Sequence, residues 1–183
     1  NLLMYAALDS VGRSGNKKVV VPATGWVTTI TPAIQLGWNP IMCETDQTTY
    51  GLDIDYLSNI LEKDHPETIM LVHVLGMPND MTKILELKKK FGFQILEDCC
   101  ASHGARHQGK LVGTFGAMSS FSFYYGHHMS TVEGGIVCRS QGASCQNVIA
   151  HNVLVIPACF TKISANVPPD IVNSFHLVVA KQA

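Results

Sequence analysis

Charged residues are scarce in this sequence: of 183 residues only 15% are Asp, Glu, Lys or Arg, and the net charge is -1. Without an excess of Lys and Arg, the chain has no electrostatic footprint for nucleic acid and no polybasic patch for a membrane surface. It also lacks an apolar run long enough to cross a bilayer and the pattern of a signal peptide. We therefore expect neither nucleic acid nor a membrane as a partner.

The six cysteines lack the spacings that would give them a role. No CxxC pair occurs and no histidines stand at ligand distance from a cysteine, so neither a metal site nor a disulfide framework is predicted. Free thiols are typical of a reducing compartment. The cysteine usage therefore predicts the cytoplasm.

The sequence has enough apolar residues, 46%, to bury the core of one domain, but its length leaves little room for a second. It begins with Asn1 rather than Met and opens directly into an apolar helical pattern, which predicts a helix over 1–8, ending near Gly12. A helix that starts without a cap suggests that the chain is a fragment.

Short apolar runs alternate with helical patterns along most of the chain. This alternation predicts right-handed βαβ units, hence an α/β fold with a mainly parallel sheet and helices on both of its faces. The β-branched run that ends at Pro22 is followed by no GxGxxG, which disfavours a dinucleotide-binding domain. Strands are predicted at 19–21, 40–43, 68–74, 93–96, 118–123 and 135–138, and helices at 28–36, 53–61 and between a cap at Asn79 or Asp80 and Gly92.

The composition changes after Arg139. From Gln141 onward the only charged residues are Lys162, Asp170 and Lys181, and no helical or alternating period persists, although 153–156 has the pattern of a strand. We therefore interpret 1–139 as a large-domain fragment and 140–183 as an unassigned tail that packs irregularly.

Ligands of open parallel sheets bind at the carboxyl ends of the strands, and candidate residues follow several predicted strands. Trp26 follows the first; it can stack on a flat heteroaromatic ring, although a core tryptophan is the commoner role. His73 follows another, where a hydrogen-bonded structural role is commoner than catalysis.

Asp98 follows a buried run, where an acidic side chain is costly unless it meets a cation or several donors. A protonated pyridine nitrogen is such a cation, and a helix cap or salt bridge is an equal alternative. Ser122, beside a glycine-containing turn, suits a phosphate. His127 and His128 in that turn are adjacent, so in extended backbone their side chains diverge, and a metal is the weaker interpretation.

Four segments in this order resemble the DegT–StrS family of sugar aminotransferases and dehydratases. They are VVVPATGWVTTITPAIQLG, VHVLGMPNDM, ILEDCCASHGARHQGKLVGTFG and FSFYYGHHMSTVEGG, and the resemblance covers about residues 1–138. It implies the large domain of the fold-type-I pyridoxal-phosphate enzymes, and a homodimer that shares its active sites between subunits.

The resemblance also implies roles for single residues. Trp26 would stack on the cofactor ring, Asp98 would pair with the ring nitrogen, and Ser122 would hold the phosphate. Most members carry the cofactor-linking lysine five residues after that serine, where this sequence has His127. The GDP-4-keto-6-deoxymannose 3-dehydratases of the family share this departure.

Without the lysine, pyridoxal or pyridoxamine phosphate would be held non-covalently, and His127 could act as the base. The resemblance therefore implies a 3-dehydratase of a nucleotide-linked 4-keto-6-deoxy sugar, with an amino donor such as glutamate, in surface polysaccharide biosynthesis. Two alternatives stay open: an aminotransferase that uses another lysine, such as Lys110, and an inactive homologue that serves as a partner subunit.

Overall fold

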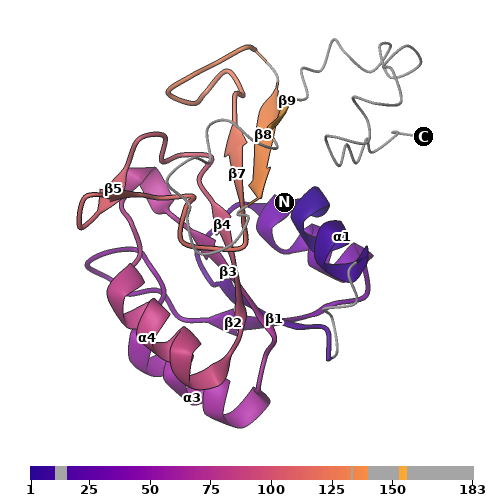
Figure 1. Ribbon diagram of the computed structural model, residues 1–183, viewed down its shortest axis with the longest axis vertical. Helices are drawn as coiled ribbons and strands as arrows, with labels where there is room; N and C mark the ends of the chain where they lie inside the picture. Colours follow the sequence, from indigo (N-terminus) through magenta and orange to yellow (C-terminus); the bar gives the residue numbers. More distant parts are fainter. Residues whose placement is uncertain (11–15, 133, 140–152, 156–183) are drawn as a thin grey trace.

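A computed structural model describes residues 1–10, 16–132, 134–139 and 153–155. A large sheet forms the centre of this part of the chain, with helices on either side of it (Figure 1). The helices are α1 (Leu2–Ser10), α2 (Thr31–Gln35), α3 (Ile54–Asp64) and α4 (Met81–Phe91), with 3-10 turns η1 (Val27–Thr29) and η2 (Val74–Gly76). The strands are β1 (Lys18–Pro22), β2 (Asn39–Cys43), β3 (Thr68–Val72), β4 (Gln94–Asp98), β5 (Arg106–His107), β6 (Lys110–Leu111), β7 (Met118–Ser122), β8 (Gly135–Arg139) and β9 (Val153–Val155).

The large sheet has the strand order β2-β1-β3-β4-β7-β8-β9. The pairings from β2 through β7 are all parallel, whereas β8 runs antiparallel to β7 and β9 antiparallel to β8. The predicted α/β fold with a mainly parallel sheet is therefore confirmed. The carboxyl ends of β1, β3, β4 and β7 lie at one edge of the sheet, which we call the carboxyl edge.

Alternate residues of the central strands enter two separate cores, because successive side chains of a strand point to opposite faces. Val19 and Val21 pack with α1 and α2, while Val20 packs with α3 and α4. Figure 1 shows α1 on one side of the sheet and α3 and α4 on the other. Both faces are buried, which explains why the strands read as continuous apolar runs rather than alternating ones.

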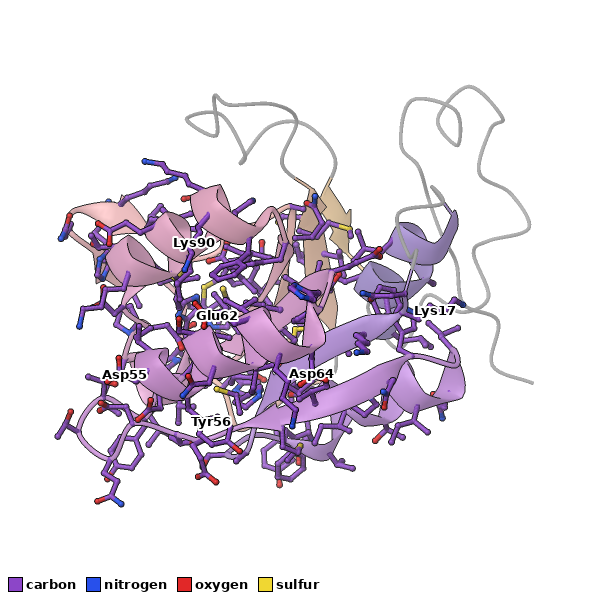
Figure 2. All side chains as sticks on the ribbon, turned by 90° about the horizontal axis from the view of Figure 1, so that it is seen from below. Lys17, Asp55, Tyr56, Glu62, Asp64 and Lys90 are labelled. Carbon is purple, nitrogen blue, oxygen red and sulfur yellow. The ribbon has the colours of Figure 1, made fainter. Side chains whose placement is uncertain are left out.

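Local signals fix the ends of α3 and α4. The carboxylates of Asp53 and Asp80 accept hydrogen bonds from backbone amides in the first turns of α3 and α4, and Gly92 ends α4 in the left-handed conformation at φ 80°. Asp80 is thus the cap of α4, one of the two residues that the sequence allowed. The two helices lie side by side in Figure 2, where Lys90 of α4 donates to Glu62 of α3 (3.1 Å).

The bounds of several predicted elements differ from the structure; the helix predicted over 53–61 continues to Asp64, and the strand predicted over 93–96 continues to Asp98. The helix expected over 28–36 is divided into η1 and α2, because Pro32 lacks an amide hydrogen and so begins a new first turn rather than continuing the preceding one. The strand expected over 68–74 stops at Val72, since the next residues form η2.

The remaining predictions concern the two ends of the chain, of which the structure describes the first residues and a short strand near the other end. The helix predicted over 1–8 is confirmed by α1, although its expected end near Gly12 lies outside the described residues. β9 confirms a strand at Val153–Val155, paired with β8. The rest of the 140–183 tail lies outside the described residues. Among the helices that are described, none is long and apolar enough to cross a membrane.

Candidate active site

The four candidate residues follow strands that end at the carboxyl edge. Asp98 is the last residue of β4 and Ser122 the last of β7, while Trp26 follows β1 and His127 lies in the turn that follows β7. Because β1, β4 and β7 run in the same direction, these positions share one edge of the sheet, as the sequence predicts. The structure therefore keeps all four residues as candidates for one site.

Asp98 presents a buried carboxylate, only 5% exposed, on the α1 face of the sheet. Its Oδ2 accepts a hydrogen bond from the side-chain amide of Asn1 (2.7 Å), and its Oδ1 accepts one from the backbone amide of Cys100 (3.1 Å). Asn1 in turn accepts a hydrogen bond from the Ser120 hydroxyl (2.8 Å), and Ser120 is the register partner of Asp98 on β7. A carboxylate has about four acceptor positions, so this one keeps room for a further donor.

Ser122 lies where β7 enters the turn that carries His127. Its Oγ accepts a hydrogen bond from the backbone amide of Tyr124 (3.2 Å), which leaves the hydroxyl hydrogen available to a ligand. Backbone hydrogen bonds close the turn, from Thr131 to Phe123 (2.9 Å) and from His127 to Tyr124 (3.0 Å). The half-buried ring of His127 lies 5.9 Å from that of Tyr124 between centroids.

Trp26 is 75% exposed and lies immediately before η1. The alternative of a core tryptophan is therefore wrong for this residue; the core tryptophan is Trp38, which is 3% exposed and packs edge-on against Tyr5. The indole of Trp26 is available to a flat ligand because its ring is not packed into the core.

A second buried carboxylate, Glu97, stands beside Asp98 but faces the opposite side of the sheet. It is 0% exposed and has four donors: the backbone amides of Gly113 (2.6 Å), Phe115 (2.8 Å) and Gly116, and His73 Nε2 (3.2 Å). His73 Nδ1 accepts from the amide of Asn79 (3.2 Å), so Nε2 carries the hydrogen that points at the carboxylate. The structural role predicted for His73 is thus confirmed.

The His73–Glu97 pair and Cys99 place three ligand-type atoms within 4.8 Å of one another, a spacing that would suit a metal. The donors already occupy the carboxylate, however, and burial raises the pKa of the Cys99 thiol well above its usual value, whereas a metal needs the thiolate. This cluster anchors the segment after β4 instead. The sequence signal was present, since an acidic pair directly follows a buried run, but only Asp98 was singled out.

Comparison with known proteins identifies the family. The model of the DegT/DnrJ/EryC1/StrS aminotransferase family matches residues 2–154. The chain belongs to this family. The match extends beyond Cys138, where the sequence resemblance stopped, and takes in the positions of β8 and β9.

Members of the DegT/DnrJ/EryC1/StrS family with curated names include both dehydratases and aminotransferases. The chain is 43% identical over 141 residues to a GDP-4-keto-6-deoxy-D-mannose 3-dehydratase of Yersinia pseudotuberculosis, covering 75% of this chain and 35% of that protein. It is 35% identical to a GDP-perosamine synthase of Escherichia coli O157:H7, covering 73% and 36%. The chain thus spans about a third of the length of these relatives.

Solved structures of family members share the fold. A histidine-to-asparagine mutant of GDP-4-keto-6-deoxymannose-3-dehydratase with bound GDP-perosamine superposes with a TM-score of 0.70 at 36% identity, covering 74% of this chain and 36% of that one. The 3-amino-5-hydroxybenzoic acid synthase superposes with a TM-score of 0.69 at 31% identity, covering 76% and 36%. The chain therefore has the fold-type-I architecture that the sequence predicted.

The residues at the carboxyl edge fit the cofactor of the DegT/DnrJ/EryC1/StrS family. The exposed indole of Trp26 complements the face of an aromatic ring. The buried carboxylate of Asp98, which can accept a further hydrogen bond, complements a protonated ring nitrogen, and the hydroxyl of Ser122, whose hydrogen is available, complements a phosphate. The position five residues after Ser122 holds an imidazole, which cannot form the stable covalent link that a primary amine forms.

Proposed function

We propose that this chain is the cofactor-binding large domain of a pyridoxamine-phosphate-dependent 3-dehydratase. Its substrate would be a nucleotide-linked 4-keto-6-deoxy sugar destined for surface polysaccharide. The observation that carries the proposal is His127, an imidazole at the place of the family's lysine, in the turn at the same sheet edge as Asp98.

The side chains of this domain would bind and orient the cofactor without a covalent bond. Trp26 would stack on the ring, Ser122 would donate to the phosphate, and Asp98 would keep the ring nitrogen protonated. When bound, the cofactor supplies an amine that condenses with a sugar ketone and a ring that withdraws electrons. His127 would take the proton from the cofactor C4′ atom while the sugar 3-hydroxyl leaves, because an imidazole exchanges protons near neutral pH.

The geometry disfavours the conventional aminotransferase that would use Lys110. That lysine belongs to the small β5–β6 hairpin rather than to the turn after β7, and its ammonium lies 4.4 Å above the ring of Phe115. A covalent link to Lys110 would require it to leave this cation–π contact.

The dehydratase proposal also implies partners for the whole protein. Regeneration of the amine would need an amino donor such as glutamate, and one solved dehydratase relative holds a trapped PLP–glutamate geminal diamine. The protein would act as a homodimer with active sites shared between subunits. A cytoplasmic location, predicted from the cysteine usage, stays a prediction.

The test is borohydride reduction of the full-length protein with pyridoxal phosphate, followed by mass spectrometry. We expect an unmodified wild-type chain from which dialysis removes the cofactor, and one cofactor mass added in His127→Lys. Lys110→Ala is the matched control and should change neither result. A stoichiometric adduct on one lysine of the wild type would overturn the dehydratase reading in favour of the aminotransferase.

A companion variant separates an enzyme from an inactive homologue. His127→Asn should still bind cofactor, because the stacking, nitrogen and phosphate contacts remain, but should lose solvent exchange of the C4′ proton. If the wild type binds the cofactor and also shows no exchange with any nucleotide-linked keto sugar, the inactive homologue becomes the better interpretation.

A further inference from the structure

A third histidine, His103, packs against the turn that carries His127 and His128. Its ring is stacked on Phe123 (centroids 5.9 Å apart, interplanar angle 27°) and tilted against Phe121 (5.6 Å, 48°). The His128 ring meets it edge-on, at 6.0 Å between centroids. The segment that follows Asp98 therefore places an imidazole against the turn that carries the proposed base.

Both ring nitrogens of His103 are shielded from solvent, and among the described residues neither has a hydrogen-bond partner. A buried polar atom without a partner is costly, so such an atom in a native structure calls for an explanation. The packing of the ring between two phenylalanines holds it in place, so the nitrogens are not free to turn to solvent.

We propose that His103 is a positioning residue of the active site, a third imidazole that stays neutral and makes the histidine cluster take up one proton at a time. The proposal rests on the function proposed above for His127. When His127 takes the proton from the cofactor C4′ atom, the positive charge is better tolerated near a neutral imidazole than near a second cation. The proton is then released to solvent, and the cluster returns to its starting charge.

Electrostatics support the neutral state. Desolvation by burial lowers the pKa of His103 first, and charges on His128 and then on His127 lower it further. Among the described residues these two histidines are the titratable groups that act on it, while the rings of Phe121 in β7 and of Phe123 just after β7 pack against it and are apolar. This arrangement couples the protonation of His103 to the histidines of the turn.

The first test follows the ring signals of His103 by NMR during a pH titration of the chain labelled at histidine. We expect the titration midpoint of His103 to move upward in His128→Asn and, by a smaller amount, in His127→Asn, because each substitution removes a neighbouring positive charge. His107→Asn is the matched control: it lies in the same segment but pairs with Thr82 (2.8 Å), and should leave the midpoint unchanged.

An unchanged His103 midpoint in both turn variants, with the fold intact by its amide spectrum, would overturn the proposal. This titration needs neither cofactor nor substrate, so it decides the coupling even if the proposed reaction fails. Conversely, if the His103 midpoint shifts as expected in both turn variants but the full-length protein does not bind the cofactor, the proposed function is wrong and the coupling between the histidines is still supported.

The second test uses His103→Phe in the full-length protein, which keeps an aromatic ring between Phe121 and Phe123. We expect cofactor binding to persist but the pH profile of C4′ proton exchange to change shape, because the neutral imidazole is lost while the packing is kept. A uniformly lower rate with the wild-type pH profile would show a merely structural role.

Discussion

The two sides of the sheet use the same pair of strand ends in opposite ways. On the α3–α4 side, Glu97 is surrounded by donors from its own chain, and its register partner Ser119 donates to the carbonyl of Gly113 (2.9 Å). On the α1 side, the Asn1 side chain bridges Asp98 and its partner Ser120, and the carboxylate keeps acceptor capacity. The hydrogen-bonding capacity of Glu97 is therefore filled within the folded chain, whereas that of Asp98 is only partly filled.

This difference explains how a costly arrangement, two acidic residues at the end of a buried strand, is tolerated. Glu97 stabilises the helix-free segment between β4 and β7 by accepting hydrogen bonds from the backbone amides of Gly113, Phe115 and Gly116, which would otherwise lack acceptors. With that segment anchored, Asp98 and the turn after β7 are held on a rigid frame. A fixed frame is what a site needs if it binds its cofactor without a covalent bond.

The largest effect is expected from removing the charge on the completed side. Glu97→Gln would turn an –NH₂ group toward backbone amides that need an acceptor, and His73 cannot switch tautomer because its Nδ1 already accepts from Asn79. We expect the free energy of unfolding to fall by about 3–5 kcal/mol, because several buried donors lose the charged acceptor that they share. Urea denaturation measures it, and a loss below about 1 kcal/mol would contradict the anchor role.

The matched change on the open side is Asp98→Asn, with a smaller effect on folding. Each carboxylate oxygen has one donor among the described residues, so the amide keeps one of the two hydrogen bonds, and we expect a loss of about 1–2 kcal/mol. Cofactor affinity of the full-length protein should fall more than stability does, since a neutral amide does not pair with the protonated ring nitrogen. Equal unfolding losses in Glu97→Gln and Asp98→Asn would erase the contrast between the two sides.

Sequence patterns predicted the elements that local chemistry specifies. A capping residue and a terminal glycine located α4, and apolar runs located the parallel strands, because both signals lie within a few neighbouring residues. The division of 28–36 by Pro32 was missed, since the same proline also fits the first turn of one continuous helix.

The site was predictable only in part. The common edge of Trp26, Asp98, Ser122 and His127 follows from parallel strands and was predicted correctly. The partner of Asp98 was not, because Asn1 lies 97 positions away and only the fold brings them together. The same holds for the amides of Gly113, Phe115 and Gly116 around Glu97, and for His103, because no local pattern shows its ring neighbours in the turn after β7.

The smallest effect should come from the two serines that stand opposite the carboxylates. Ser119→Ala removes a buried hydrogen bond to the carbonyl of Gly113 and Ser120→Ala removes one to Asn1, so each should lower the free energy of unfolding by about 1 kcal/mol. Their effects on cofactor affinity should nevertheless differ. Ser120 orients Asn1, which holds Asp98, so its loss should weaken binding of pyridoxamine phosphate by the full-length protein, whereas loss of Ser119 should not. Fluorescence titration with each variant at a fixed fraction folded measures this, and equal weakening in both would show that the two sides are not separate.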